Sequence, residues 1–251
     1  MDSRFVTTEA VVLNSIRFGE GHKIINLFTE RFGRIEASAF GARKTKSKFG
    51  SRLEPFTISQ LVLYRKNEDS PFSISEADIR FQDSSFSAEY EKYIIASALI
   101  ESVVLFVAAG QIEAGLYRLL SESLRVLSSI PTNKCKYLLS MYDVQFLMHM
   151  GYTPNTSLCK KCGREMGESE ASIDHFFGFP LCSKCAGDGS FTVLGGALRF
   201  IRWACEQPVF VSKKVKMEKM TLRNLRSVIE LLYMHTFHRK PQSWKQLNAL
   251  L

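Results

Sequence analysis

The chain has 251 residues, of which 45% are hydrophobic and 23% charged, and this composition excludes a disordered or fibrous protein for most of its length. The formal net charge is +8, and the excess lies at the two ends: residues 1–80 carry 13 basic and 10 acidic side chains, and residues 191–251 carry 11 and 3. Basic ends around a nearly neutral middle fit a scaffold that binds polyanions, although basic charge also serves solubility.

Two features bear on the cellular compartment. The longest nearly apolar run, from Ile94 to Ala109, is shorter than the roughly 20 residues that cross a bilayer, and it predicts a buried core helix. The first ten residues lack the pattern of a secretory signal. We therefore expect a cytoplasmic protein that does not contact membranes, in which closely spaced cysteines hold a metal ion rather than form disulfides.

Residues 1–80 have the pattern of β-structure, because short apolar stretches are separated by turn signals. The predicted strands are Thr8–Ile16, Lys23–Phe28, Arg34–Ala39, Phe56–Tyr64 and Phe72–Ile79. A five-residue connection, 67–71, predicts a hairpin between the last two. Five strands in about 80 residues are typical of an OB-type barrel, so residues 1–80 are predicted to be an OB-fold nucleic-acid-binding domain.

From Phe86 to Met150 the pattern is helical, and Gly110 and Pro131 divide it into about three helices. One face is expected to be buried and consists of Ile112, Leu116, Leu119, Leu120, Leu127 and Ile130. Two further helices are expected near residues 193–206 and 217–237. The predicted fold class is α+β: the barrel is followed by an α-helical domain over residues 81–251, with a four-cysteine zinc module inserted at about 152–190.

Two Cys-x-x-Cys pairs carry the strongest signal in the chain. They consist of Cys159, Cys162, Cys182 and Cys185, with 19 residues between the pairs. This spacing is expected of a four-cysteine zinc site, and four thiolates leave no coordination position for an activated water, so the zinc would be structural. The alternatives are a redox pair and free thiols. His175 is expected to be a solvated or packed residue rather than a ligand, and Cys135 and Cys205 to be inert.

The segment Gly41–Arg52 is predicted to be a loop between barrel strands. It has no acidic residue and carries the basic side chains Arg43, Lys44, Lys46, Lys48 and Arg52. Loops of an OB barrel commonly line its nucleic-acid groove, and Phe40 and Phe49 can stack on bases as well as anchor the loop. The alternative is a mobile, solvated loop.

A second basic cluster lies near the C-terminus. It comprises Lys213, Lys214, Lys216, Lys219, Arg223 and Arg226, and Arg239, Lys240 and Lys245 follow. If the chain is helical from about residue 216, the last four of the cluster share an arc of about 80°, beside a buried face with Leu225, Ile229, Leu232 and Thr236. Such a stripe can bind phosphates, and an ordinary solvated helix face looks similar. The predicted DNA-binding residues from this region are Lys216, Lys219, Arg223, Arg226, Arg239 and Lys240.

Catalytic motifs are missing from the sequence: there is no P-loop, no Gly-x-Ser-x-Gly, no His-Glu-x-x-His and no Rossmann glycine fingerprint. We therefore expect a protein without an active site. Three functions remain at this point: a non-enzymatic DNA-binding protein; a zinc-containing regulatory or transcription-associated nucleic-acid-binding protein; and a nuclease without a familiar motif.

Across essentially its whole length the chain resembles RecO, the bacterial recombination mediator of the RecFOR pathway. The resemblance rests on the order and spacing of Val11–Leu13, Phe18–Glu20, Phe28–Ile35, Gly41–Ser47, Leu53–Phe56, the two cysteine pairs, and His238–Lys240 with Ser243. One departure is Gly21-His22-Lys23, where the family usually has a small residue and an acid. Some relatives lack the zinc cysteines, all four of which are present here.

The resemblance implies an N-terminal OB-fold, a helical domain and a zinc module. It also implies a bacterial, nucleoid-associated protein that binds single- and double-stranded DNA and anneals complementary strands. The implied partners are RecR, the C-terminal tail of single-strand-binding protein, and indirectly RecA, which the family helps to load onto DNA coated with single-strand-binding protein. Arg43, Lys44, Lys46 and Arg52 match the basic loop of the family's OB-fold.

Overall fold

The computed structural model describes residues 4–152, 157–167, 170–175 and 178–247. It divides into two compact units, Met1–Ser128 and Ser129–Leu251. The sequence pattern changes after residue 80, whereas the division between the compact units falls later, so that two long helices belong to the same unit as the N-terminal strands. Each unit is described by itself below.

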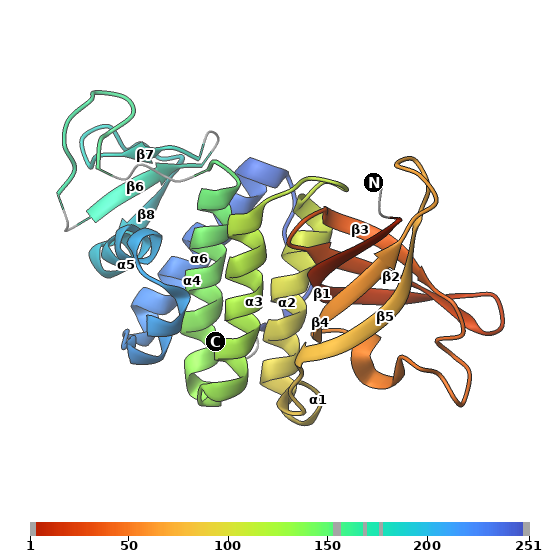
Figure 1. Cartoon of the computed structure of the whole chain (residues 1–251). Helices are drawn as coiled ribbons and strands as arrows, with labels where there is room; N and C mark the ends of the chain where they lie inside the picture. Colours follow the sequence, from red (N-terminus) through yellow and green to blue (C-terminus); the bar gives the residue numbers. More distant parts are fainter. Residues whose placement is uncertain (1–3, 153–156, 168–169, 176–177, 248–251) are drawn as a thin grey trace. The chain divides into compact units, whose positions relative to one another are not determined.

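The first unit contains one five-stranded sheet (Figure 1). Its strands are β1 (Phe5–Phe18), β2 (His22–Thr29), β3 (Gly33–Ala39), β4 (Ile58–Tyr64) and β5 (Phe72–Phe81). The strands are hydrogen-bonded in the order β1-β2-β3-β5-β4, and β1 also pairs with β4, so each strand has two partners. All pairs are antiparallel except β3 with β5. The five strands predicted from the sequence are confirmed.

Alternating side chains of the sheet form a continuous apolar core. The core includes Ala10 and Val12 of β1, Ile25 and Leu27 of β2, and Leu61 and Leu63 of β4. Phe49 and Leu53 join it from the segment between β3 and β4, which contains a short 3₁₀ helix, η1 (Gly50–Leu53). Because buried apolar side chains contribute about 1.5–3 kcal/mol each, these two anchor that segment to the sheet.

Three helices complete the first unit: α1 (Ser85–Ala88), α2 (Tyr90–Phe106) and α3, which begins at Ala114 and ends at Ser129. On α3, the Tyr117 hydroxyl donates a hydrogen bond to Glu9 Oε1 of β1 at 2.9 Å. Arg34 Nε of β3 donates to the Val107 carbonyl at the end of α2, also at 2.9 Å. The residues predicted to form one apolar face are buried except Ile112, which precedes the helix and is 59% exposed.

At Gly33, the first residue of β3, the backbone lies against the connection between α2 and α3. Its φ is +65°, and a Cβ there would lie 1.9 Å from the Gln111 carbonyl oxygen. Gly33→Ala is therefore expected to destabilise the protein by more than about 2 kcal/mol, since the left-handed backbone alone costs roughly 1–2 kcal/mol. Gly110→Ala is the matched control, because its φ is +75° and nothing lies within 4 Å of its Cβ position. If urea unfolding showed that both variants lose the same free energy of unfolding, this account would be contradicted.

The second unit is helical with a small sheet (Figure 1). Its long helices are α4 (Cys135–His149), α5 (Gly195–Glu206) and α6 (Lys219–Phe237), followed by the short α7 (Trp244–Leu247). Two 3₁₀ helices, η2 (Thr132–Lys134) and η3 (Val209–Lys214), precede α4 and α6. The strands β6 (Glu170–Asp174), β7 (Pro180–Leu181) and β8 (Ser190–Leu194) form an antiparallel sheet in the order β7-β6-β8, which the sequence analysis does not predict.

Side-chain amides fasten these elements together. Gln145 of α4 donates through Nε2 to the carbonyls of Ala204 and Gln207, at 2.8 and 2.6 Å, and so holds the end of α5. Asn224 of α6 accepts from the Leu194 amide and donates to the Thr192 carbonyl, both at 2.9 Å. The small sheet is thus attached to α6 through both the oxygen and the nitrogen of the Asn224 side-chain amide.

Candidate nucleic-acid interface and metal centre

The basic loop predicted from the sequence lies between β3 and β4 and is held in place. The Arg43 guanidinium donates to the carbonyls of Gly19 and Glu20 at 3.2 and 3.1 Å, and the Arg43 amide donates to Gly21 at 3.1 Å. These three bonds tie the loop to the turn between β1 and β2. The described loop is therefore attached near its start rather than freely solvated.

Within this loop the other basic side chains fall into two groups. Lys48 Nζ donates to the Ser75 carbonyl at 2.6 Å, and Arg52 Nη1 donates to the carbonyls of Lys48 and Phe49 at 3.3 and 3.4 Å. Lys44 and Lys46 are exposed, and among the described residues neither side chain makes a hydrogen bond or an ion pair. Lys44 and Lys46 therefore have the ammonium groups most available to a phosphate.

The two aromatic residues of this region have different roles. Phe49 is buried in the core, so its predicted role in base stacking is wrong and its predicted role as an anchor is confirmed. Phe40 is 58% exposed, and its ring makes an edge-on contact with His22, with the ring centroids 5.3 Å apart. Ile16 and Phe18 at the end of β1 are also exposed. Their alternation with Arg17 is visible in the sequence, but they were not predicted as a contact surface.

The second basic cluster is only partly a surface stripe. Lys213, Lys214 and Lys216 are exposed, but α6 begins at Lys219, after Glu218 in an extended conformation. The predicted helix start at about residue 216 is therefore wrong, and Lys216 does not share the helical arc. Lys219 and Arg223 are exposed on α6.

Arg226 is predicted to bind DNA, and the structure contradicts this prediction. It is buried, its Nη1 lies 2.5 Å from Asp143 Oδ2, and its guanidinium lies 4.7 Å from the Trp244 ring centroid. Tyr233 donates a longer hydrogen bond to the other oxygen of Asp143. Burial raises the pKa of Asp143, and the guanidinium opposes that effect. Arg226 is thus engaged inside the unit and is not available to DNA.

The two basic residues after α6 also differ. His238 ends the helix with a left-handed backbone, at φ 55°. Arg239 is exposed, whereas Lys240 forms an ion pair with Glu230. Of the DNA-binding residues predicted in the second unit, the exposed ones are therefore Lys216, Lys219, Arg223 and Arg239.

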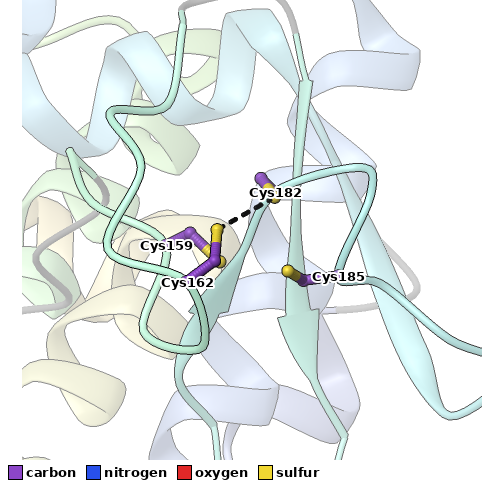
Figure 2. A group of neighbouring side chains, drawn as sticks. All are labelled: Cys159, Cys162, Cys182 and Cys185. Atoms are coloured by element: carbon purple, nitrogen blue, oxygen red, sulfur yellow. Dashed lines mark hydrogen bonds between the residues drawn. The ribbon is translucent and has the colours of Figure 1, made fainter.

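The four cysteines come together as the spacing predicts (Figure 2). Their sulfurs all lie within 4.8 Å of one another, and the Sγ atoms of Cys162 and Cys182 are 3.8 Å apart. Four sulfurs placed about 2.3 Å from one zinc ion at tetrahedral angles would be about 3.8 Å apart. His175 is not part of the cluster among the described residues. The chemistry and spacing of these donors fit a tetrahedral zinc ion.

Each cysteine pair sits on a tight turn. The Cys159 carbonyl accepts from Gly163 at 2.8 Å, and the Cys182 carbonyl accepts from Cys185 and Ala186, both at 2.9 Å. A hydrogen bond from the backbone of Cys182 contributes most to lowering the pKa of Cys159, to about 6. Hydrogen bonding to Cys162 raises the pKa of Cys185 to about 12. The backbone N–H groups of these turns therefore favour the thiolate form of Cys159, which is the form that binds a metal ion.

Comparison with known proteins gives a consistent result for both parts of the chain. The family model "Recombination protein O N terminal" matches residues 1–81, and "Recombination protein O C terminal" matches residues 87–245. The chain belongs to the RecO family. Proteins named DNA repair protein RecO match it from Desulfatibacillum aliphaticivorans, with 25% identity over 98% of this chain and 97% of the relative, and from Nocardioides, with 30% identity over 80% and 84%.

The Streptomyces avermitilis protein of the same name is 30% identical over 79% of this chain and 85% of its own. The resemblance found in the sequence is therefore confirmed as membership of the RecO family. Separately, among the residues with described structure, no helix combines the length and apolar character that a membrane span requires.

Proposed function

We propose that the protein acts in DNA repair as a non-enzymatic DNA-binding recombination mediator. The observation that carries this proposal is the loop between β3 and β4: Arg43 fixes it to the β1–β2 turn, Lys44 and Lys46 are exposed and unpaired among the described residues, and the exposed Phe40 ring lies at its start. Charged side chains for phosphates beside an aromatic ring for bases are what sequence-tolerant binding of single strands requires.

We propose that the five-stranded sheet is an OB-type barrel. The order β1-β2-β3-β5-β4, with the β1–β4 pairing and the parallel contact of β3 with β5, supports this assignment. In such a barrel the loops between strands border the nucleic-acid groove. The basic loop and the β1–β2 hairpin would then form one border of the groove, with Phe18 and Phe40 as stacking residues.

We further propose that the protein binds double-stranded as well as single-stranded DNA and anneals complementary strands without ATP. Two strands repel each other through their phosphates, so annealing requires that both be neutralised while the base edges stay free. The chain carries exposed basic residues in both units: the loop in the first, and Lys216, Lys219, Arg223 and Arg239 in the second. Either each cluster holds one strand, or both follow a single strand and two protein molecules cooperate.

Family membership supports a proposal about partners. These are RecR, the C-terminal tail of single-strand-binding protein, and indirectly RecA, which the protein would help to load at the bacterial nucleoid in the cytoplasm. We also propose that one structural zinc ion is bound by Cys159, Cys162, Cys182 and Cys185. When bound, the ion would cross-link the two turns, and these residues would hold it without leaving a position for substrate.

The Lys44→Glu/Lys46→Glu double variant tests the proposed interface. The slope of log binding constant against log salt concentration reports the number of phosphates that the protein neutralises, and each phosphate of a single strand contributes about −0.7 to it. Losing two phosphate contacts should therefore make the slope less negative by about 1.4. Binding should weaken similarly for all base sequences. Fluorescence anisotropy with labelled oligonucleotides at several salt concentrations measures both effects.

Lys66→Glu provides the control, because Lys66 is exposed in the connection between β4 and β5, outside the loop. It should leave the slope nearly unchanged. The same proteins are compared in annealing of complementary oligonucleotides without nucleotide, where the double variant should be slower. A folded double variant with an unchanged slope would remove the loop from the interface, and cleavage of the DNA would instead favour a nuclease.

A further inference from the structure

A pocket of about 670 Å³ in the first unit is used by neither the proposed DNA interface nor the metal centre. It lies where the chain enters β4 and where the segment after β5 leads into α1 and α2, and its lining includes Glu54, Phe56, Asp83, Phe86 and Tyr93. Its volume is within the range of small-ligand sites. The lining includes part of the Leu53–Phe56 motif, which the DNA-binding proposal leaves without a role.

Three aromatic rings from separate parts of the chain converge at this pocket. Phe56 lies before β4, Phe86 on α1 and Tyr93 on α2. The ring of Phe56 meets those of Phe86 and Tyr93 edge to face, with centroids 5.8 and 5.7 Å away. Phe86 is buried, whereas Tyr93 is 46% exposed. The pocket therefore has a fixed aromatic interior and an accessible aromatic rim.

The backbone of Phe56 is strained into position. Its φ is +69°, in the left-handed region that residues with a Cβ rarely adopt. The conformation is held by hydrogen bonds on both sides: the Phe56 amide donates to Val12 at 3.0 Å, and the Val12 amide donates to Thr57 at 2.9 Å. Backbone strain of this kind, held by surrounding structure, is concentrated at ligand-binding sites.

The charge of the lining decides what kind of ligand fits. It contains two carboxylates, Glu54 and Asp83, and no basic side chain. Glu54 is paired with Lys23 at 2.9 Å. Asp83 accepts a hydrogen bond from the Ser85 amide at 2.8 Å and meets no basic side chain among the described residues. An uncompensated carboxylate beside aromatic rings repels a nucleotide phosphate and attracts a cation.

We propose that this pocket binds an arginine side chain of a partner protein. A guanidinium is planar and weakly hydrated, so it can lie against the Phe56 and Tyr93 rings while its fork of N–H donors meets the Asp83 carboxylate. A lysine ammonium lacks both the flat face and the fork. The site thus gives this chain a protein-binding function that is independent of its binding to DNA.

The test uses the full chain and two capped tripeptides, acetyl-Gly-Arg-Gly-amide and the same peptide with citrulline, which keeps the shape of arginine and removes its charge. Binding is followed by the NMR shift of the Ser85 amide, which reports on Asp83. The arginine peptide should give a saturable shift and the citrulline peptide none. Asp83→Asn should weaken binding by about tenfold, the effect of losing one charge-assisted hydrogen bond.

Asp78→Asn is the matched control, because Asp78 is exposed on β5 outside this pocket and the variant loses the same charge. It should bind within about twofold of the unchanged protein, as expected if long-range charge is screened. Tyr93→Ala, at an exposed position of α2, should weaken binding without disturbing the fold. Absence of saturable binding, equal binding of citrulline, equal losses in Asp78→Asn and Asp83→Asn, or a response to an oligonucleotide instead would each overturn the proposal.

Discussion

Protein purified without chelator is expected to contain one zinc ion per chain, and Cys159→Ser is expected to lose it. The four sulfurs already lie within 4.8 Å of one another, and structural zinc contributes about 10–16 kcal/mol of apparent binding free energy in finger peptides. Removing one ligand should therefore unfold the turns around the cysteines and loosen β7, which leads into Cys182. Elemental analysis measures the metal, and hydrogen exchange of the 157–194 segment measures the unfolding.

Cys205→Ser is the control for this experiment, because Cys205 lies on α5 and is not part of the cluster. It should keep a full equivalent of zinc. In Cys159→Ser, amide exchange within β1–β5 of the first unit should be unchanged, since no ligand comes from those strands. Metal well below one equivalent in the unchanged protein, with all thiols free, would refute the zinc site.

The second large effect is expected at the buried pair of Asp143 and Arg226. Arg226→Met should destabilise the second unit by about 3–5 kcal/mol, because it leaves the fully buried Asp143 carboxylate without its cation. Replacing both residues, as Asp143→Leu/Arg226→Met, should recover much of that loss, since an apolar pair of similar volume is often tolerated. Urea unfolding of the three proteins measures the differences. A double variant no more stable than Arg226→Met would contradict this account.

The pH dependence of the same variant has a definite sign. Burial raises the pKa of Asp143 above its unfolded value, and loss of Arg226 removes the main group that opposes the shift. A carboxyl whose pKa is raised on folding is favourable below its unfolded pKa and becomes costly as the pH rises through the folded pKa. The loss of stability in Arg226→Met should therefore be smaller in acidic buffer than at neutral pH.

Features set by local pattern were predictable from the sequence. The five strands follow from apolar stretches separated by turn signals, and the helices from apolar residues at helical spacing between Gly110 and Pro131. The cysteine cluster follows from spacing alone, because each Cys-x-x-Cys turn is a local structure and a metal site demands four donors. The strands β6–β8 were missed because they are short and interleaved with the glycines and cysteines of the metal module.

Features set by distant contacts were not predictable. Arg226 has helical spacing from Arg223 and so was predicted to be exposed with it. Its contacts are with Asp143 of α4 and Trp244 of α7. Helical periodicity within α6 does not reveal which of its basic residues another element covers. The burial of Phe49 was not predictable for the same reason, because the core that it enters is formed by residues from all five strands of the sheet. The left-handed backbone of Phe56 depends on its hydrogen bond to Val12, which no local pattern encodes.

The bonds between β-strands and helices in the first unit have a consequence for how the chain is divided. Tyr117 reaches Glu9, and Arg34 reaches Val107, so the sheet uses partners that lie beyond residue 81. A fragment that ends where the first family match ends would leave those groups without partners and uncover the Phe28 ring that faces Tyr117. The boundary between the two family segments therefore cuts through a compact unit, and a fragment of residues 1–128 is expected to keep these bonds where one of residues 1–81 is not.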